Sequence, residues 1–258
     1  MNRQTAPAGR NIVAPFLVLL LCTGGALAQD QAGYSPATPK NLTLLGIPSA
    51  TAAPHGLVFA SLSGSTRRAG SSSGSVDGSL ALGFGLGSAE DGIGFQFIVQ
   101  TTSLTNDFGD SGYLGVKAVR RIASGRVPTY VGLSVDQIGS WGDASGVDTR
   151  ATVMLTSFTQ LAMAGDVYPV MFTIGAGSHV RNNDTDPGLF AGAGIGLTKN
   201  VGASLAWNGE NFDLGTSFKI DGLDNFGFTA TANDVFNDDA SRRVTFTVNW
   251  FLRDAFGG

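Results

Sequence analysis

The two histidines are the first residues to examine for catalytic chemistry. His179 directly follows Ser178, with Asp184 and Asp186 a few residues further on, whereas His55 lies in a proline-containing stretch. Serine, histidine and an acid are the groups that carry out acyl-ester hydrolysis. Adjacent side chains of a strand point to opposite faces, so a nucleophile–base pair between these two neighbours is not expected. We therefore predict no catalytic residues and no enzymatic activity. His179 is interpreted as an ordinary residue at the point where a strand meets a loop.

Two clusters of oxygen-bearing side chains raise the question of a metal site. Carboxylate and amide oxygens at such density can hold Ca²⁺, but their spacing fits no EF-hand loop and the same residue types form ordinary turns. We predict no metal site and no cofactor. The clusters are Asn182, Asn183, Asp184 and Asp186, and then Asn233, Asp234, Asn237, Asp238 and Asp239.

Glycine-rich stretches at residues 83–87 and 192–196 could suggest a phosphate-binding loop. A phosphate loop of that kind needs a following helix and a Lys-Ser/Thr pair, and both stretches lack them. Glycine at every second position is better explained by a crowded inner face of a β-structure.

Six charged residues share one face of the predicted strands and are the candidates for a functional lining. Their signs are mixed. One interpretation is a set of ion pairs that balance one another inside a narrow barrel, and the other is a polar channel lining that selects solutes. The residues are Lys117, Asp136, Arg150, Asp213, Lys219 and Arg243.

The elements that position these residues are strands of period two. Between residues 189 and 253, runs of about ten residues alternate with turn residues, and large apolar residues occupy every second position. In one run Phe212 and Leu214 oppose Asp213 and Gly215. The pattern extends back to residue 56 and predicts about twelve strands. The second face is mostly Gly, Ser, Thr and Ala, as in a barrel lumen, whereas a soluble sandwich would expose large charged residues there.

The composition supports a strand-built membrane protein. The chain has 258 residues with 37 glycines, and only 14% of its residues are charged. After residue 29 no apolar run approaches the ~20 residues that a transmembrane helix needs. Since only helices and closed barrels satisfy their backbone in lipid, we predict an all-β, antiparallel, up-and-down transmembrane barrel. The net charge of −4 argues against a nucleic-acid partner.

The first 55 residues divide into two segments. Residues 1–29 have the form of a cleaved signal peptide, with Arg3 and Arg10 before an apolar run and a cleavage site at Ala26-Leu27-Ala28. Residues 30–55 form a proline-containing lead, either extended in the periplasm or folded into the barrel mouth. Residues 56–258 are the predicted barrel. The sole cysteine, Cys22, would leave with the signal peptide, which excludes disulfides and thiolate sites from the mature chain.

The mature chain resembles a Gram-negative outer-membrane β-barrel. That resemblance implies an outer-membrane location, lipid contacts and recognition by the barrel-assembly machinery. Residues 44–50 (LLGIPSA) with 54–56, and residues 205–209 (LAWNG) with 213–215, are similar to patterns of YjbH-type barrels, which implies a link to surface polysaccharide. Such barrels usually end on an aromatic residue, but here the chain continues past Trp250-Phe251 to Gly258.

Function is less well determined than fold. The favoured hypothesis is a porin-like narrow channel for small polar solutes, because about twelve strands enclose less space than the 16–18 strands of large porins. The alternative is a closed structural or export-partner barrel linked to surface polysaccharide. An outer-membrane hydrolase is the third and least favoured hypothesis.

Overall fold

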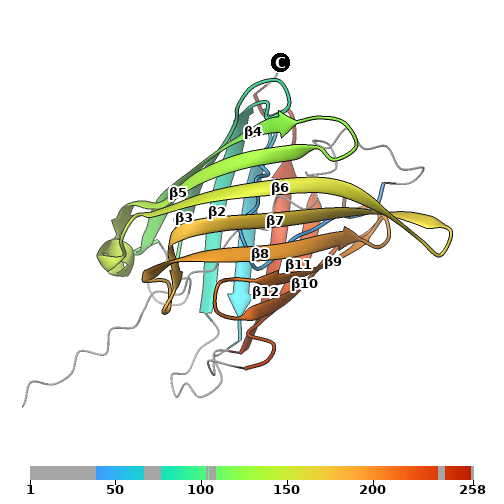
Figure 1. Ribbon diagram of the computed structural model, residues 1–258. Helices are drawn as coiled ribbons and strands as arrows, with labels where there is room; N and C mark the ends of the chain where they lie inside the picture. The colour runs from blue at the N-terminus through green and yellow to red at the C-terminus, as the bar shows by residue number, and fades with distance from the viewer. Residues whose placement is uncertain (1–38, 67–76, 103, 105–108, 238–241, 257–258) are drawn as a thin grey trace, which may run out of the picture.

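Twelve antiparallel strands close into a barrel (Figure 1). The computed structural model describes residues 39–66, 77–102, 104, 109–237 and 242–256. The predicted signal peptide, residues 30–38 of the lead, and Asp238 and Asp239 lie outside this part of the chain. The predicted fold class and strand number are confirmed.

Each strand is hydrogen-bonded to its neighbour in sequence, and β1 pairs with β12 to close the sheet. The register at the closure runs from Val58↔Leu252 to Ser65↔Thr245. The strands are β1 (Val58–Ser65), β2 (Asp77–Gly87), β3 (Gly94–Thr101), β4 (Gly112–Ala123), β5 (Thr129–Trp141), β6 (Arg150–Met163), β7 (Asp166–Arg181), β8 (Asp186–Gly196), β9 (Val201–Trp207), β10 (Phe212–Phe218), β11 (Phe226–Asn233) and β12 (Arg243–Leu252), with a 3₁₀ turn, η1 (Gly142–Gly146), after β5.

The barrel has two mouths, which differ in the turns that they hold. The terminal mouth is the end where β1 begins at Val58, β12 ends at Leu252 and β6 turns into β7 at Ala164. The opposite mouth holds the turns between β5 and β6 and between β7 and β8. No helix in the described residues is long and apolar enough to cross a membrane.

The β6–β7 hairpin is longer than the sequence pattern predicted. The alternation in the sequence by itself predicts a connection over residues 159–167, but pairing continues to Met163↔Asp166 around a turn at Ala164 and Gly165. Both turn residues have positive φ, 53° and 80°, which suits the twist of a tight hairpin. The next connection, expected over residues 179–187, is also shorter, because β7 runs to Arg181 and β8 starts at Asp186.

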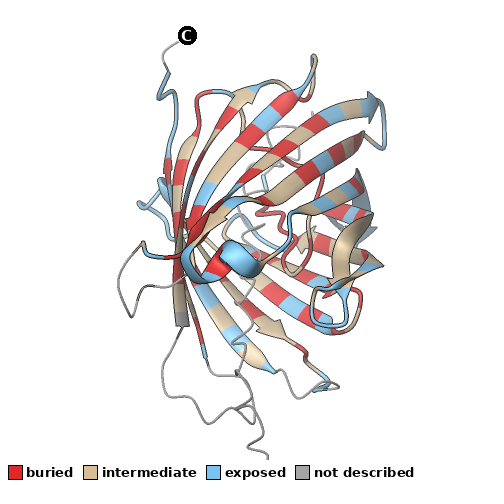
Figure 2. Ribbon diagram, turned by 90° about the vertical axis from the view of Figure 1, so that its left-hand side faces the viewer, coloured by how far each residue is buried: buried red, intermediate tan, exposed pale blue. Residues whose placement is uncertain are grey.

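The large apolar side chains point outward. Leu82, Leu133 and Leu205 are about half exposed, whereas their small neighbours on the alternate positions are buried. Figure 2 shows this alternation as buried and exposed bands along the strands. Aromatic rings also stack across neighbouring strands on this surface, as Phe218 does on Phe228 at 5.3 Å between centroids. The face assignment made from the sequence therefore holds, and it is the reverse of a soluble sandwich.

Arginine at the middle of the apolar outer band should be costly in a bilayer. Leu133, in the middle of β5, is 54% exposed, and Ile122, near the end of β4, is 58% exposed. We expect Leu133→Arg to lower the free energy of unfolding in lipid vesicles by about 2–4 kcal/mol, and Ile122→Arg by about 0–1 kcal/mol, because the cost falls with distance from the midplane. Guanidinium unfolding followed by tryptophan fluorescence measures both. Equal, small losses would contradict a lipid-facing band.

Candidate functional site: the barrel lumen

The lumen is occupied by residues 40–57, here called the lumen segment. It enters at the terminal mouth, where the Asn41 N–H donates to the Thr198 carbonyl at 2.8 Å. It turns in the interior around Gly46, whose φ is +91° and whose neighbour is Asp213. It then returns past Ala50, which lies against Gly132, and joins β1 at the mouth where it began. The sequence left the lead in the periplasm or in the barrel mouth; the structure places its described part inside the barrel.

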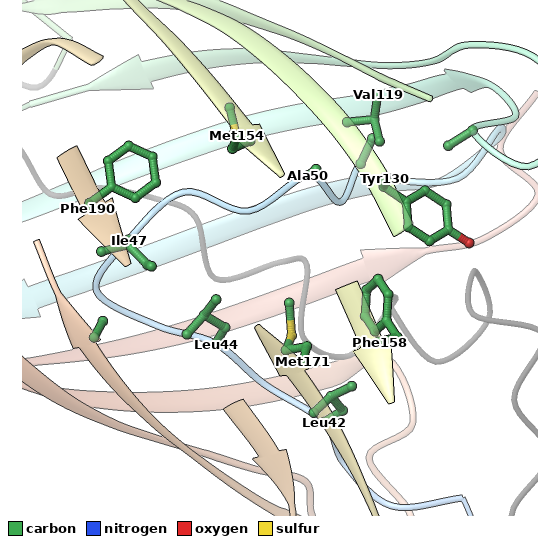
Figure 3. Packing of buried hydrophobic residues seen from close by; sticks show 13 residues of the cluster. Leu42, Leu44, Ile47, Ala50, Val119, Tyr130, Met154, Phe158, Met171 and Phe190 are labelled. Carbon is green, nitrogen blue, oxygen red and sulfur yellow. The ribbon is translucent and has the colours of Figure 1, made fainter. Parts of the chain in front are cut away.

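We divide the lumen segment into a first limb, residues 40–48, and a second limb, residues 49–57. Apolar side chains of both limbs form the core of the protein together with the inner wall. Leu42, Leu44 and Ile47 are almost fully buried, in one cluster with Met171 and Phe190. Figure 3 shows the segment bending among these wall residues and Met154, Tyr130 and Phe158. The core therefore lies inside the barrel.

Side chains of the wall satisfy the backbone of the lumen segment, which lies outside the β-ladder. The Leu45 N–H donates to Ser204 Oγ at 3.1 Å, the Ala50 N–H to Thr156 Oγ1 at 2.8 Å and the Ala53 N–H to Gln96 Oε1 at 2.9 Å. Lys117 Nζ donates to the Thr51 carbonyl at 3.2 Å. Because buried backbone groups need partners, these inward hydroxyl and amide groups have a structural role.

Glycines of the inner face make room for the backbone of the segment. A Cβ on Gly194 would lie 1.8 Å from the Thr43 carbonyl oxygen, and one on Gly202 would lie 2.1 Å from that of Asn41. A Cβ on Gly85 would lie 2.1 Å from the Ala53 carbonyl oxygen. The crowded inner face expected from the glycine pattern is present, and the chain's own segment crowds it.

Three of the six predicted lining residues lie on the neighbouring strands β4, β5 and β6. Lys117 is 5% exposed and contacts the lumen segment, as described above. Asp136 pairs in register with Arg150 on β6. Arg150 also forms an ion pair with Asp184 of the β7–β8 turn, at 3.3 Å. This group therefore extends from the segment toward the opposite mouth.

The other three predicted lining residues lie on or next to the C-terminal strands β10 and β12. Asp213 is 1% exposed and accepts hydrogen bonds from the Asp234 N–H at 3.0 Å and from Asn208 Nδ2 at 3.3 Å. Arg243 is half-buried, paired in register with Asn233. Lys219 lies just beyond the end of β10, also half-buried. The six residues therefore form no single cluster, and their role in selecting solutes stays a prediction.

Sequence reasoning did not identify the lumen segment or the groups that hold it. Gln96, Thr156 and Ser204 occupy alternate, inward positions of their strands, and the sequence alone does not mark them as partners of this segment. One signal was available, because residues 41–54 contain no charged residue and are mostly apolar or small, which is unusual for a periplasmic linker. The pairing of that stretch with the wall depends on contacts more than 100 residues apart in two of the three cases above.

A turn at the terminal mouth packs beneath the lumen segment. In the β2–β3 connection Ala89 is buried, and its carbonyl accepts from the Arg121 N–H at 2.8 Å. Glu90 accepts hydrogen bonds from both the Arg121 guanidinium and the Tyr130 hydroxyl. The turn thereby ties β2 and β3 to β4 and β5 at this mouth.

The expectation that Ser178 and His179 point apart is wrong. Ser178 Oγ lies 2.7 Å from His179 Nδ1, because the β7–β8 register is irregular between Gly177 and Arg181 and strict alternation is lost there. The nearest described acid is Asp148, with Oδ2 4.0 Å from Nε2, beyond hydrogen-bond distance. Ser178 Oγ also accepts from the Ala151 N–H at 3.1 Å. This is a local bond between adjacent residues without the connected acid that a catalytic triad needs.

The first oxygen-rich cluster lies at the β7–β8 turn, and the second begins at Asn233, the last residue of β11, and continues into the turn at Asp234 and Asn237. Asn182, Asn183 and Asp184 all adopt left-handed backbone conformations, which Asn and Asp tolerate best, and Asn182 Nδ2 donates to Asp186. Within the described residues, no group of three or more His, Cys, Asp or Glu side chains is placed to hold a metal ion.

Comparison with known proteins finds similar solved structures only. No family model and no curated protein matches the chain. It is similar to the KdgM porin in complex with disordered oligogalacturonate (13% identity, TM-score 0.48, 74% of this chain and 98% of that one). It is also similar to Omp33 of Acinetobacter baumannii (10%, 0.45, 76% and 97%) and to the COG4313 outer membrane channel of Pseudomonas putida F1 (11%, 0.41, 78% and 97%). None of these matches shows the suggested YjbH-type resemblance.

A methyl group on Gly194 should displace the first limb. We expect Gly194→Ala to lower the free energy of unfolding by about 1–3 kcal/mol, the usual cost of overpacking, because the new Cβ collides with the Thr43 backbone. Gly227→Ala is the matched control, since a Cβ there meets only the edge of the Phe251 ring, with Cε2 at 3.3 Å and Cζ at 3.7 Å. Guanidinium unfolding in lipid vesicles measures both variants. Equal stability of the two would show that the first limb does not occupy the lumen.

Proposed function

We propose that this protein is an outer-membrane β-barrel that forms a narrow channel for small polar solutes, and that the structure is its closed state. The observation that supports this most directly is the closed barrel with an apolar outer face and a small, polar inner face. In a bilayer the ladder satisfies all strand backbone groups, and an apolar exterior is stable only against lipid. The terminal mouth would face the periplasm, since a chain that crosses an even number of times has both ends on one side.

The lumen segment limits what such a channel could conduct. It contacts the wall from Gly85 on β2 round to Gly215 on β10. Twelve strands already enclose less space than large porins do. Any flux through the resting protein should therefore be small, and larger conductance would require the segment to move.

A closed structural or export-partner barrel is the second candidate. The filled lumen favours it, because a barrel whose interior is its own core needs no opening to be stable. The sequence resemblance to YjbH-type barrels would then suggest surface polysaccharide as the partner. Under this hypothesis loss of the protein would alter capsule or biofilm while leaving solute uptake unchanged.

Single-channel recording in a planar bilayer separates the two candidates. We expect brief, small current steps from detergent-extracted protein whose folding is verified by heat-dependent gel mobility. Lys117→Met should shift the reversal potential toward cation selectivity and Asp213→Asn toward anion selectivity, because each removes one lumen charge of known sign. Each variant thus serves as the control for the other. Silence from folded wild-type protein and from both variants would reject the channel and favour the closed barrel.

A further inference from the structure

We infer that the first limb is a displaceable plug, which withdraws through the terminal mouth while the second limb stays in the wall. This inference rests on the proposed channel function and adds the part of the chain that opens it. It makes residues 40–48 the moving element of the barrel and leaves all twelve strands in place.

The second limb is built into the barrel. It continues directly into β1, and the Gly56 N–H and the Leu57 carbonyl both bond to the backbone of Gly85 on β2, at 3.2 and 2.9 Å. The Gly56 carbonyl also accepts from the Ala255 N–H at 2.9 Å. Ala53 and Leu57 pack with Phe59 and Phe251 in a second core cluster. Moving this limb would disrupt the junction of β1 and β2.

The first limb is held more weakly to the wall. Within the described part of the chain, one backbone–backbone hydrogen bond joins it to the barrel, from Asn41 to Thr198. The other polar anchors use side chains: the Leu45 N–H donates to Ser204 Oγ, and Asn41 Nδ2 donates to Ser217 Oγ at 2.9 Å and to the Asn200 carbonyl at 3.2 Å. Lys40 adds an ion pair at the mouth. These bonds are individually modest and are replaced by water when the limb leaves.

The wall along the first limb is rich in glycine. The backbone and side chains of the limb lie against glycines of β8, β9 and β10, which carry no side chain to interlock with it. Apart from Met171 and Phe190, whose side chains share the apolar cluster of the limb, withdrawal runs along these glycines. These wall residues are Gly192, Gly194, Gly196, Gly202 and Gly215.

Two features keep the plug seated. Burial of Leu42, Leu44 and Ile47 favours the closed state, because withdrawal would expose them to water. At the mouth Lys40 Nζ forms an ion pair with Asp166 at 2.6 Å and lies 3.5 Å from the Tyr168 ring centroid. Lys40 is the outermost of these anchors, so its ion pair must break before the plug can withdraw. We call this ion pair the latch.

The latch has a matched control at the same mouth. Lys199 forms an ion pair of similar length, 2.8 Å, with Asp221, which joins the β8–β9 and β10–β11 turns. The carbonyls of its neighbours Thr198 and Asn200 accept from Asn41, and these backbone bonds are retained when the Lys199 side chain is changed. This interaction lowers the pKa of the Asp221 carboxyl below its usual range, mainly through the hydrogen bond from Lys199. Lys40→Met and Lys199→Met remove the same charge, and only the first removes a contact of the plug.

Thiol labelling tests the movement separately from conductance. Single cysteines replace Leu44 on the first limb or Ala53 on the second, both 1% exposed, in a Cys22→Ser background. A membrane-impermeant maleimide then reports how often each position reaches water. We expect Leu44→Cys to react faster than Ala53→Cys. Lys40→Met should speed labelling at position 44 by about fivefold to thirtyfold, the combined loss of an ion pair and a cation–π contact, while Lys199→Met leaves it unchanged.

Parallel current recordings distinguish failure of the inference from failure of the proposed function. Faster labelling at position 44 and more frequent current steps in Lys40→Met support both. Faster labelling without any current supports the movable plug and rejects the channel. Current steps with equal labelling rates at positions 44 and 53, or equal effects of Lys40→Met and Lys199→Met, would overturn the plug.

Discussion

Pairing of β1 with β12 is the constraint on which the rest of the structure depends. Once these two strands bond, every strand has two neighbours and the sheet has no edge. The outward face can then be apolar along its whole height, because no backbone group needs water there. The same closure creates an enclosed space, and the inward face must either line it or fill it.

The chain fills that space with its own N-terminal segment. Small inward side chains alone would leave the interior of a twelve-stranded barrel hollow. Glycines on the wall and small residues on the segment let the two backbones approach closely, as Gly194 does with Thr43. Hydroxyl and amide side chains of the wall replace the ladder as partners for the backbone of the segment. The glycine-rich wall and the segment are therefore complementary in shape and in hydrogen bonding.

Two of the predicted lining charges contact the lumen segment. Lys117 bonds the second limb, and Asp213 lies against the turn at Gly46. Arg150 instead pairs with Asp184 near the opposite mouth. Selectivity and closure therefore share residues in the proposed channel, so a change of lumen charge is expected to alter both.

The sequence by itself determined the strand number and the direction of the strand faces. These properties depend on period-two alternation within single strands. That alternation is local, so it can be read without knowing which strands pair. It did not determine the length of the β6–β7 hairpin, where the turn at Ala164 and Gly165 decided the register. Nor did it determine the Ser178–His179 contact, which depends on an irregularity that breaks the alternation.

Only the tertiary structure decided where residues 40–57 lie. Their position follows from contacts such as Ala50 with Thr156 and Lys40 with Asp166, which join residues more than 100 positions apart. A segment without strand pairing carries no periodic signal that could place it inside or outside the barrel. The closed wall defines the location of this segment, because it supplies both the enclosed space and the hydrogen-bond partners of the segment's backbone.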